Sequence, residues 1–304
     1  MAAEWRSIMK KTVFTGAATA IVTPMRADGS VDFEAFERLI EWQIEKKIDA
    51  LVVAGTTGEG STLSDEEHRE LIRFAVEKVN KRIPVIAGTG SNDIAYAVDL
   101  TKYCCEADAD AMLVVTPYYN KATQGGLIKS FTAIADASTK PVILYNVPSR
   151  TGCSLLPETY AVLAEHENIC AVKEASGNIS QIAELASLTK GKLDIYSGND
   201  DQIVPVLSLG GKGVISVLSN ILPAETSEMV HSYLNGNTEK SLDLQLKYLK
   251  LINALFCEVN PIPVKAALAA MGYGENALRL PLTPIEKSHE DKLLGLMKEA
   301  GILC

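Results

Sequence analysis

The stretch ICAVKEAS, residues 169–176, has the pattern of a buried β-strand with a lysine inside it. Apolar residues fill most of the run, which has the length of a core strand. Lys173 nevertheless occupies its middle. A charged ammonium is costly to bury unless it is paired or loses its proton. The fold around this strand and the chemistry of its lysine therefore have to be explained together.

Seven other apolar, β-branched runs of the same kind recur along the chain and end in glycine or polar residues. The starts of successive runs are 20 to 34 residues apart, which leaves room for a helix between neighbours. Repeated strand–helix units with hydrophobic strands predict parallel strands covered by helices. The seven runs are TAIVTP (19–24), ALVVAGTTGE (50–59), PVIAGTG (84–90), AMLVVTPYYN (111–120), PVILYNVPSR (141–150), LDIYSGND (193–200) and GVISVLSN (213–220).

The segments between the runs are expected to be helical. Asp32 is a candidate N-cap for a helix whose apolar side chains fall near one face. Ser64 and Glu67 form a capping-box pattern for the next helix. The apolar face of the first helix consists of Phe33, Phe36, Ile40 and Ile44.

Eight such units within residues 13–236 fit a closed (β/α)8 TIM barrel, which takes about 200–250 residues. An open doubly wound sheet is the alternative architecture. It would place a glycine fingerprint after the first strand, and TAIVTPMRADGS (19–30) has none. We therefore predict a (β/α)8 barrel domain over residues 1–236.

Residues 237–304 have a different character and are predicted to form a small C-terminal helical domain. Thr283, Pro284 and Glu286 fit the N-cap, N1 and N3 positions of a last helix. A preceding segment, 241–256, has apolar residues at helical spacing that we interpret as packing residues: Leu242, Leu246, Leu249, Ile252 and Phe256.

Composition excludes several classes of protein. The net charge of −9 argues against nucleic acid or an anionic membrane as the main partner. No apolar run reaches the ~18 residues of a membrane span, and the N-terminus has no apolar segment typical of a signal peptide. The six cysteines form no CxxC pair and the four histidines no HExxH motif. We therefore expect a cytoplasmic protein with reduced thiols and no metal site, and we interpret Cys170 and Cys257 as small core residues.

Polar side chains gather where the predicted strands end, the end of such a barrel that carries chemistry. Alone, Gly55–Gly60 could be a tight turn, Tyr145 a core residue and Arg150 a surface charge. Lys173 differs, because it cannot easily reach water and Glu174 points to the opposite face. A buried, neutral lysine is a nucleophile for carbonyl groups. Such Schiff-base chemistry needs proton shuttles, which Tyr145 and Thr57 could supply, and carboxylate binders, which Thr56, Thr57 and Arg150 could supply.

Six motifs in this order resemble the 4-hydroxy-tetrahydrodipicolinate synthase (dihydrodipicolinate synthase) family, a branch of the pyruvate-dependent class I aldolases that include N-acetylneuraminate lyase. The resemblance extends from about Phe14 to residue 284. The motifs are GTTGE (55–59), TPYYN (116–120), YNVPSRTG (145–152), AVKEASGN (171–178), GVISV (213–217) and NPIPVK (260–265).

This resemblance implies that Lys173 forms a Schiff base with pyruvate and that no other cofactor is used. Thr56 and Thr57 would bind the carboxylate region of pyruvate, and Thr57 would share a proton relay with Tyr145 and Tyr119. Arg150 would hold the carboxylate of L-aspartate 4-semialdehyde. The product would feed lysine and diaminopimelate biosynthesis.

The resemblance further implies that the backbone of Gly198 and Ile215 lines the pyruvate pocket. Tyr119 would enter the site from a neighbouring subunit, which requires a tight dimer. The family is usually a homotetramer built as a dimer of dimers.

Feedback-inhibited members of the family bind lysine at the dimer interface, and this chain departs from their pattern. Asp65 replaces a histidine and Tyr96 replaces a glutamate. A neutral phenol cannot neutralise a bound ammonium as a carboxylate does. We therefore expect weak or absent inhibition by lysine. The full set of matching positions is Gly60, Ser61, Asp65, His68, Asn92, Tyr96 and Tyr118.

Three other functions remain open at this stage. A sister aldolase that cleaves N-acetylneuraminate or a 2-keto-3-deoxy sugar acid would share Lys173, Tyr145 and the threonines. Arg150 favours a short carboxylate-bearing aldehyde over such a polyol. A non-catalytic barrel that senses a keto acid is the second alternative. A sugar-phosphate enzyme is the third, although the eighth run, VLSNILPAE (217–225), lacks the glycine of a phosphate loop.

Overall fold

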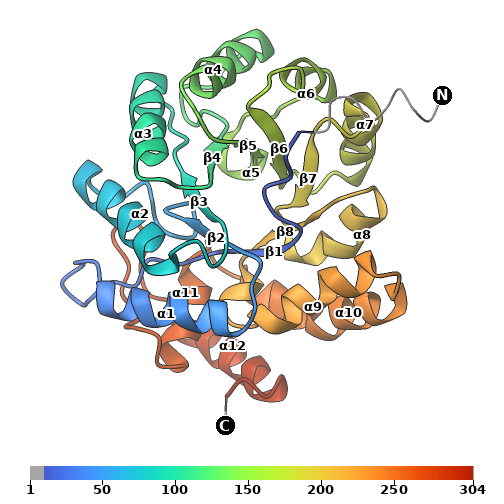
Figure 1. Cartoon of the computed structure of the whole chain (residues 1–304). Helices are drawn as coiled ribbons and strands as arrows, with labels where there is room; N and C mark the ends of the chain where they lie inside the picture. Colours follow the sequence, from blue (N-terminus) through green and yellow to red (C-terminus); the bar gives the residue numbers. More distant parts are fainter. Residues whose placement is uncertain (1–9, 304) are drawn as a thin grey trace.

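The structure, a computed structural model, describes residues 10–303. Eight strands in this range form a closed barrel in chain order, every neighbouring pair is parallel, and β1 pairs with β8. Figure 1 looks along the barrel, with strands in the middle and helices around them. The predicted (β/α)8 TIM barrel is confirmed. The strands are β1 (Gly16–Ala20), β2 (Ala50–Val53), β3 (Val85–Gly88), β4 (Ala111–Val115), β5 (Val142–Asn146), β6 (Ile169–Glu174), β7 (Asp194–Ser197) and β8 (Gly213–Ser216).

The helices follow the strands in alternation, and three more close the chain after the barrel. Short pieces after β5, β7 and β8 are α5 (Pro148–Thr151) and the 3₁₀ helices η2 (Asp200–Gln202) and η3 (Leu218–Asn220). The longer helices of the barrel and the three that follow are α1 (Phe33–Glu45), α2 (Asp65–Val79), α3 (Ile94–Glu106), α4 (Gln124–Asp136), α6 (Pro157–Leu163), α7 (Ile179–Thr189), α8 (Ile203–Ser208), α9 (Pro223–Leu234), α10 (Thr238–Ala254), α11 (Ile262–Ala270) and α12 (Lys287–Glu299).

Each predicted strand exists, but the polar tails of the runs form loops. The first run was placed too late, because β1 begins at Gly16 and ends at Ala20. The Ile21 N–H still donates to the Val52 carbonyl of β2 at 3.1 Å, but the Val22 N–H donates to the Asn220 side chain at 3.2 Å, so the ladder ends there. An apolar run alone does not show where the ladder of hydrogen bonds stops.

Two of the three predicted helix starts are confirmed. The Asp32 side chain accepts the Ala35 N–H at 3.0 Å, and the capping box of Ser64 and Glu67 is complete. The start of the last helix was wrong, since α12 begins at Lys287 with Glu286 as its N-cap. The Glu286 N–H donates to the Glu258 side chain at 2.9 Å, which holds the preceding segment out of the helix.

The three C-terminal helices, α10 to α12, pack beside the barrel, but the predicted apolar face of α10 was partly wrong. Leu242 and Leu246 are 46% and 58% exposed. Ile252 is buried as predicted, and the helix buries Tyr248 and Leu251 in place of the two leucines. The helical spacing was predicted correctly, but α10 buries a partly different face. Other leucines of the segment also fit a helical repeat, so the sequence alone did not identify the buried ones. The predicted boundary at residue 236 falls between α9 and α10, and the division into two domains stays a prediction.

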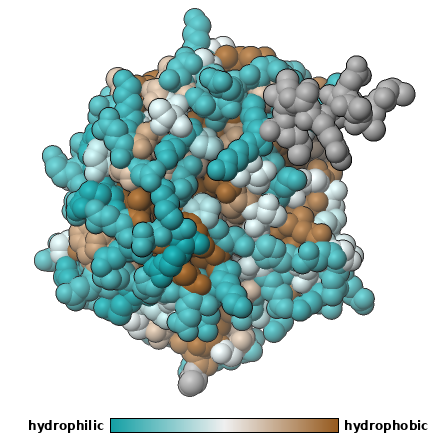
Figure 2. Space-filling model, viewed as in Figure 1, coloured by the Kyte–Doolittle hydropathy of each residue, from teal (hydrophilic) through white to brown (hydrophobic). Residues whose placement is uncertain are grey.

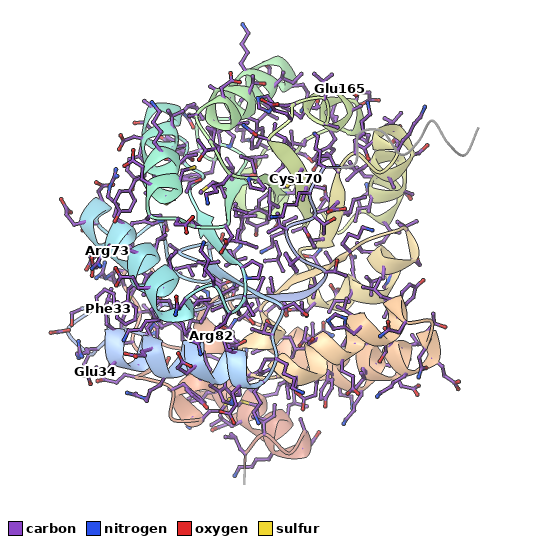
Figure 3. All side chains as sticks on the ribbon, in the orientation of Figure 1. Phe33, Glu34, Arg73, Arg82, Glu165 and Cys170 are labelled. Atoms are coloured by element: carbon purple, nitrogen blue, oxygen red, sulfur yellow. The ribbon has the colours of Figure 1, made fainter. Side chains whose placement is uncertain are left out.

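The outer surface is polar, as Figure 2 shows for one face, where apolar residues gather toward the middle. Figure 3 places Arg73 and Glu165 at the rim and Cys170 near the barrel. Cys170 is buried as predicted, whereas Cys257 is exposed, so its assignment to the core was wrong. Within residues 10–303 no helix is both long and apolar enough to cross a membrane, and no cluster of candidate metal ligands occurs.

Strand β6 has two polar side chains on opposite faces, as the alternation of a strand requires. Glu174 lies toward the helix layer and is 1% exposed. Its carboxylate accepts the Tyr160 hydroxyl at 2.6 Å, the Ser176 N–H at 2.7 Å and the Asn146 amide at 3.2 Å. This network fixes β6 against β5 and α6, and it leaves the barrel face of β6 to Lys173.

Replacing Tyr160 with phenylalanine removes one donor from this buried carboxylate. We predict that Tyr160→Phe lowers the free energy of unfolding by roughly 1–3 kcal/mol, because a hydrogen bond to a charged group is lost inside the protein. Tyr233→Phe, on the partly exposed face of α9, is the matched control and should change it by less than about 0.5 kcal/mol. Equal effects in urea denaturation would contradict the assigned role of Glu174.

Candidate active site

Lys173 faces the inside of the barrel and is only 5% exposed. Its register partners are Tyr145 on β5 and Tyr196 on β7. The ammonium lies 4.4 Å from the centroid of the Tyr145 ring, as the sequence predicted for neighbouring strands. Burial lowers the pKa of Lys173 to about 8, with Asp200 raising it and Arg150 lowering it. About a tenth of the amine is then neutral at pH 7, compared with well under a thousandth for an ordinary lysine.

Asp200 is a buried carboxylate that the sequence analysis did not single out. It begins η2, just beyond β7, and is 2% exposed. Its Oδ2 accepts the N–H groups of Val217 at 3.0 Å and Leu218 at 2.8 Å, while its Oδ1 is buried without a hydrogen-bond partner in the described part of the chain. Burial raises the pKa of Asp200, and the charge of Lys173 opposes this. The carboxylate is therefore the charge that favours the protonated form of Lys173.

Tyr145 is the hydroxyl-bearing side chain against whose ring the Lys173 ammonium lies. It is 7% exposed, and burial raises the pKa of its phenol. The phenol hydrogen-bonds with the side chain of Thr56. Thr57, predicted as the partner of Tyr145, instead accepts the Asn260 amide at 2.9 Å and is 3% exposed. The two threonines of this turn thus differ, since Thr56 is exposed and Thr57 is buried, and the proton relay through Thr57 stays a prediction.

A cavity of about 510 Å³ lies at this end of the barrel. It unites three of the predicted active-site residues with most of the positions matched to a lysine-binding site. Lys173 is not among the residues that line it, but the Tyr145 ring against which its ammonium lies is. The predicted residues that line the cavity are Thr56, Tyr145, Arg150, Gly60, Ser61, Asp65, His68, Tyr96 and Tyr118.

The other predicted residues lie off this cavity. Ile215 is fully buried in β8. The Gly198 N–H donates to the Glu174 carbonyl at 2.8 Å, and a Cβ on Gly198 would come within 2.6 Å of the Ala175 Cβ, so only glycine fits without a shift. Asn92 contributes its carbonyl, which accepts the Asn120 amide at 3.1 Å.

Arg150 and Tyr119 lie in the loops that follow β5 and β4. Arg150 is exposed on α5, and its guanidinium donates to the Asn260 carbonyl at 3.1 Å. Tyr119 is 92% exposed and has a φ of 68°. Such a φ is unfavourable for a tyrosine, and so large an exposed ring is unusual in an isolated subunit.

Three of the positions matched to a lysine-binding site, Asp65, His68 and Tyr96, form hydrogen bonds within the protein. Asp65 accepts the Arg69 guanidinium at 2.8 Å and hydrogen-bonds with Tyr96, whose pKa is raised to about 12 by burial and this contact. The His68 ring pairs with the Gly88 carbonyl at 2.9 Å, and burial lowers its pKa. The Asp65 carboxylate, already paired with an arginine, is therefore poorly placed to neutralise a ligand ammonium.

Comparison with known proteins shows the family of this chain. The model of the dihydrodipicolinate synthetase family matches residues 13–300. The chain belongs to this family. A 4-hydroxy-tetrahydrodipicolinate synthase of Lachnoclostridium phytofermentans is 58% identical over 96% of this chain and 99% of its own. The resemblance drawn from six motifs is confirmed.

Two solved structures of the family are close to this one. A chloride-inhibited dihydrodipicolinate synthase from Acinetobacter baumannii, complexed with pyruvate, is 46% identical with a TM-score of 0.94 and covers 96% of this chain and 100% of its own. A monomeric dihydrodipicolinate synthase variant is 44% identical with a TM-score of 0.94 and covers 96% of this chain and 98% of its own.

The position of Asp200 predicts how Lys173 titrates. In protein carrying ¹³C-labelled lysine, the ε-carbon resonance of Lys173 should titrate near pH 8. Asp200→Asn removes a negative charge that stabilises the ammonium, so the midpoint should fall by about one pH unit. Asp201→Asn, at the exposed next position, should leave it unchanged. Equal midpoints in all three proteins would contradict the assigned influence of Asp200.

Proposed function

We propose that the chain condenses pyruvate with L-aspartate 4-semialdehyde to form 4-hydroxy-tetrahydrodipicolinate, the first committed step of lysine and diaminopimelate biosynthesis. The observation that carries this proposal is the buried Lys173 amine against Tyr145, in a chain of this family. A desolvated amine with a lowered pKa is the nucleophile that a keto acid needs. The name of the 58% identical relative, 4-hydroxy-tetrahydrodipicolinate synthase, supports the same reaction.

In the proposed reaction the neutral Lys173 amine attacks C2 of pyruvate. Tyr145, paired with Thr56, donates a proton to the departing hydroxide, and water leaves as the carbon–nitrogen double bond forms. The resulting cation withdraws electrons, so C3 loses a proton and the protonated imine becomes an enamine. C3 then attacks the aldehyde carbon of the second substrate. The amine of that substrate replaces Lys173 at C2, which closes the ring and frees the lysine, and no further cofactor is consumed.

The substrate carboxylates have separate binding groups in this proposal. Thr56 and Thr57, with the backbone of Gly198 and Ile215, would hold the pyruvate end. Arg150 would hold the carboxylate of the aldehyde, since a guanidinium pairs with a carboxylate through two parallel hydrogen bonds. This group is what favours the synthase over a sister aldolase that cleaves N-acetylneuraminate or a 2-keto-3-deoxy sugar acid.

We further propose a homo-oligomer, a dimer of dimers in which Tyr119 enters the site of a neighbouring subunit. The exposure of Tyr119 and its positive φ support a partner at this position. A backbone held in this region costs about 1–3 kcal/mol, which an intersubunit contact would offset. The cytoplasm is the proposed location.

Steady-state assays test the proposed function. The wild type should condense pyruvate with L-aspartate 4-semialdehyde, and Lys173→Met should have no activity. Arg150→Met should lower kcat/KM for the aldehyde by about 10- to 100-fold, because a hydrogen-bonded charge pair is lost. Arg38→Met, an exposed arginine on α1, is the control and should retain full activity. Activity only in sugar-acid cleavage would reject the synthase.

The contacts around Asp65 and Tyr96 generate a prediction about regulation. L-lysine should inhibit the condensation with a half-maximal concentration above about 1 mM, because Asp65 is already paired with Arg69 and Tyr96 carries no charge to neutralise its ammonium. Inhibition is measured with pyruvate near its KM. Half-maximal inhibition well below a millimolar would show that the altered positions still bind lysine.

A further inference from the structure

The NPIPVK segment, residues 260–265, belongs to the C-terminal helices but reaches into the active site. The Asn260 amide donates to the Thr57 hydroxyl at 2.9 Å, and the Asn260 carbonyl accepts the Arg150 guanidinium at 3.1 Å. One residue thus contacts the loops that follow β2 and β5. Nothing in the barrel itself joins these two side chains in residues 10–303.

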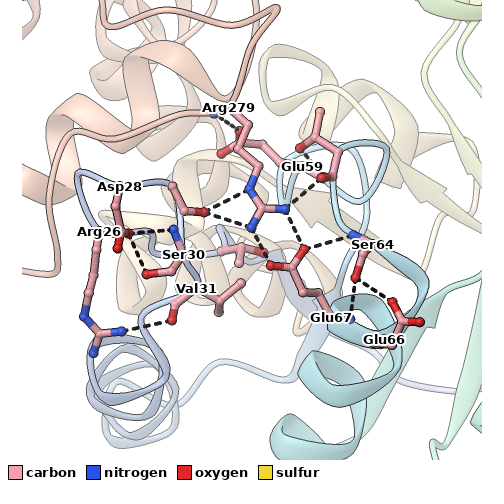
Figure 4. A network of polar contacts seen from close by, with 12 residues as sticks. Arg26, Asp28, Ser30, Val31, Glu59, Ser64, Glu66, Glu67 and Arg279 are labelled. Carbon is pink, nitrogen blue, oxygen red and sulfur yellow. Dashed lines mark hydrogen bonds and ion pairs between the residues drawn. The ribbon is translucent and has the colours of Figure 1, made fainter.

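A buried ion pair fixes this segment against the loop after β2. The Lys265 ammonium lies 2.5 Å from the Glu59 carboxylate, and the two side chains are 2% and 1% exposed. Glu59 also accepts the Arg279 N–H at 3.2 Å. Figure 4 shows the Arg279 guanidinium bonded to the Glu67 carboxylate and to backbone carbonyls, which are those of Gly29 and Thr62. The anchoring places Asn260 beside Thr57, two residues before Glu59.

The direction of the Asn260–Thr57 hydrogen bond has a chemical consequence. A threonine hydroxyl has one proton and two lone pairs. Because the Asn260 N–H takes a lone pair, the Thr57 proton stays available, and in the described part of the chain it is donated to no protein group. The Asn260 Oδ1 is buried without a partner, which costs free energy. The amide is therefore held by the contact of its Nδ2 with Thr57.

We propose that Asn260 is a positioning residue that sets Thr57 as a hydrogen-bond donor toward the carboxylate of pyruvate. The NPIPVK segment is then part of the substrate site and not only a packing element. This inference rests on the proposed function, since it assigns the pyruvate carboxylate to Thr57. The side chain of Asn260 would act on pyruvate through Thr57, while the carbonyl of Asn260 accepts a hydrogen bond from Arg150.

Asn260→Asp is the sharpest variant because it preserves shape and reverses the hydrogen bond. A carboxylate accepts the Thr57 proton and adds a negative charge beside an anionic substrate, so KM for pyruvate should rise by more than about tenfold. Asn260→Ala loses the donor alone and should raise it about five- to tenfold. In Asn260→Ala, KM for L-aspartate 4-semialdehyde should stay within about twofold, because the backbone carbonyl remains. Asn253→Asp, on the exposed face of α10, is the control and should leave both constants unchanged.

A double-mutant cycle separates positioning from loss of structure. If Asn260 acts through Thr57, Asn260→Ala should raise KM for pyruvate no further in a Thr57→Val background. Additive effects, or a KM in Asn260→Asp equal to that of Asn253→Asp, would overturn the inference. Should Asn260→Ala fail to fold, Asn260→Leu, which lacks the amide donor and adds no charge, gives the same comparison alone and with Thr57→Val.

Trapping the imine with pyruvate and borohydride distinguishes a failure of the role of Asn260 from a failure of the proposed function. A trapped wild type with normal KM values in the Asn260 variants overturns this inference alone. A wild type that forms no adduct overturns the proposed function, and the inference falls with it.

Discussion

The burial of the Lys173 ammonium is the constraint on which the site depends. A barrel strand with apolar neighbours removes the amine from water, and this desolvation is the largest cause of its lowered pKa. The fold supplies this environment because inward positions of parallel barrel strands are packed. The neighbouring position, Glu174, lies on the helix side and is satisfied there, so the two charges of β6 do not neutralise each other. The alternation of a single strand thus separates a structural carboxylate from a reactive amine.

Charges around Lys173 tune this environment in opposite directions. Burial lowers the pKa of Lys173 to about 8, while Asp200 favours the ammonium and Arg150 disfavours it. That balance suits an amine that has to lose a proton before attack and become a cation afterwards. The same groups are tied to the rest of the molecule: Asp200 to the start of η3, and Arg150 to Asn260 ahead of α11. Barrel and C-terminal helices therefore meet near Lys173 and the residues proposed to bind the substrates.

The sequence predicted the parts of this account that depend on local pattern or on neighbouring strands. Hydrophobic runs at regular spacing determine a barrel, and adjacency of β5 and β6 brings Tyr145 to Lys173. The path of a loop was not predictable, so the contact of Thr56 with Tyr145 was not foreseen. Asp200 and Asn260 were missed because their partners, Val217 and Thr57, are 17 and 203 residues away in the chain. Which leucines of α10 face inward likewise depends on tertiary packing.

Peptide mapping after borohydride reduction in the presence of pyruvate tests the central claim most directly. The account predicts one adduct per chain, located on Lys173 within the 169–176 stretch, and none in Lys173→Met. It also predicts that the yield falls below pH 8, where the amine is protonated. An adduct on another lysine, or none at all in the folded wild type, would contradict the claim that burial makes Lys173 the covalent nucleophile.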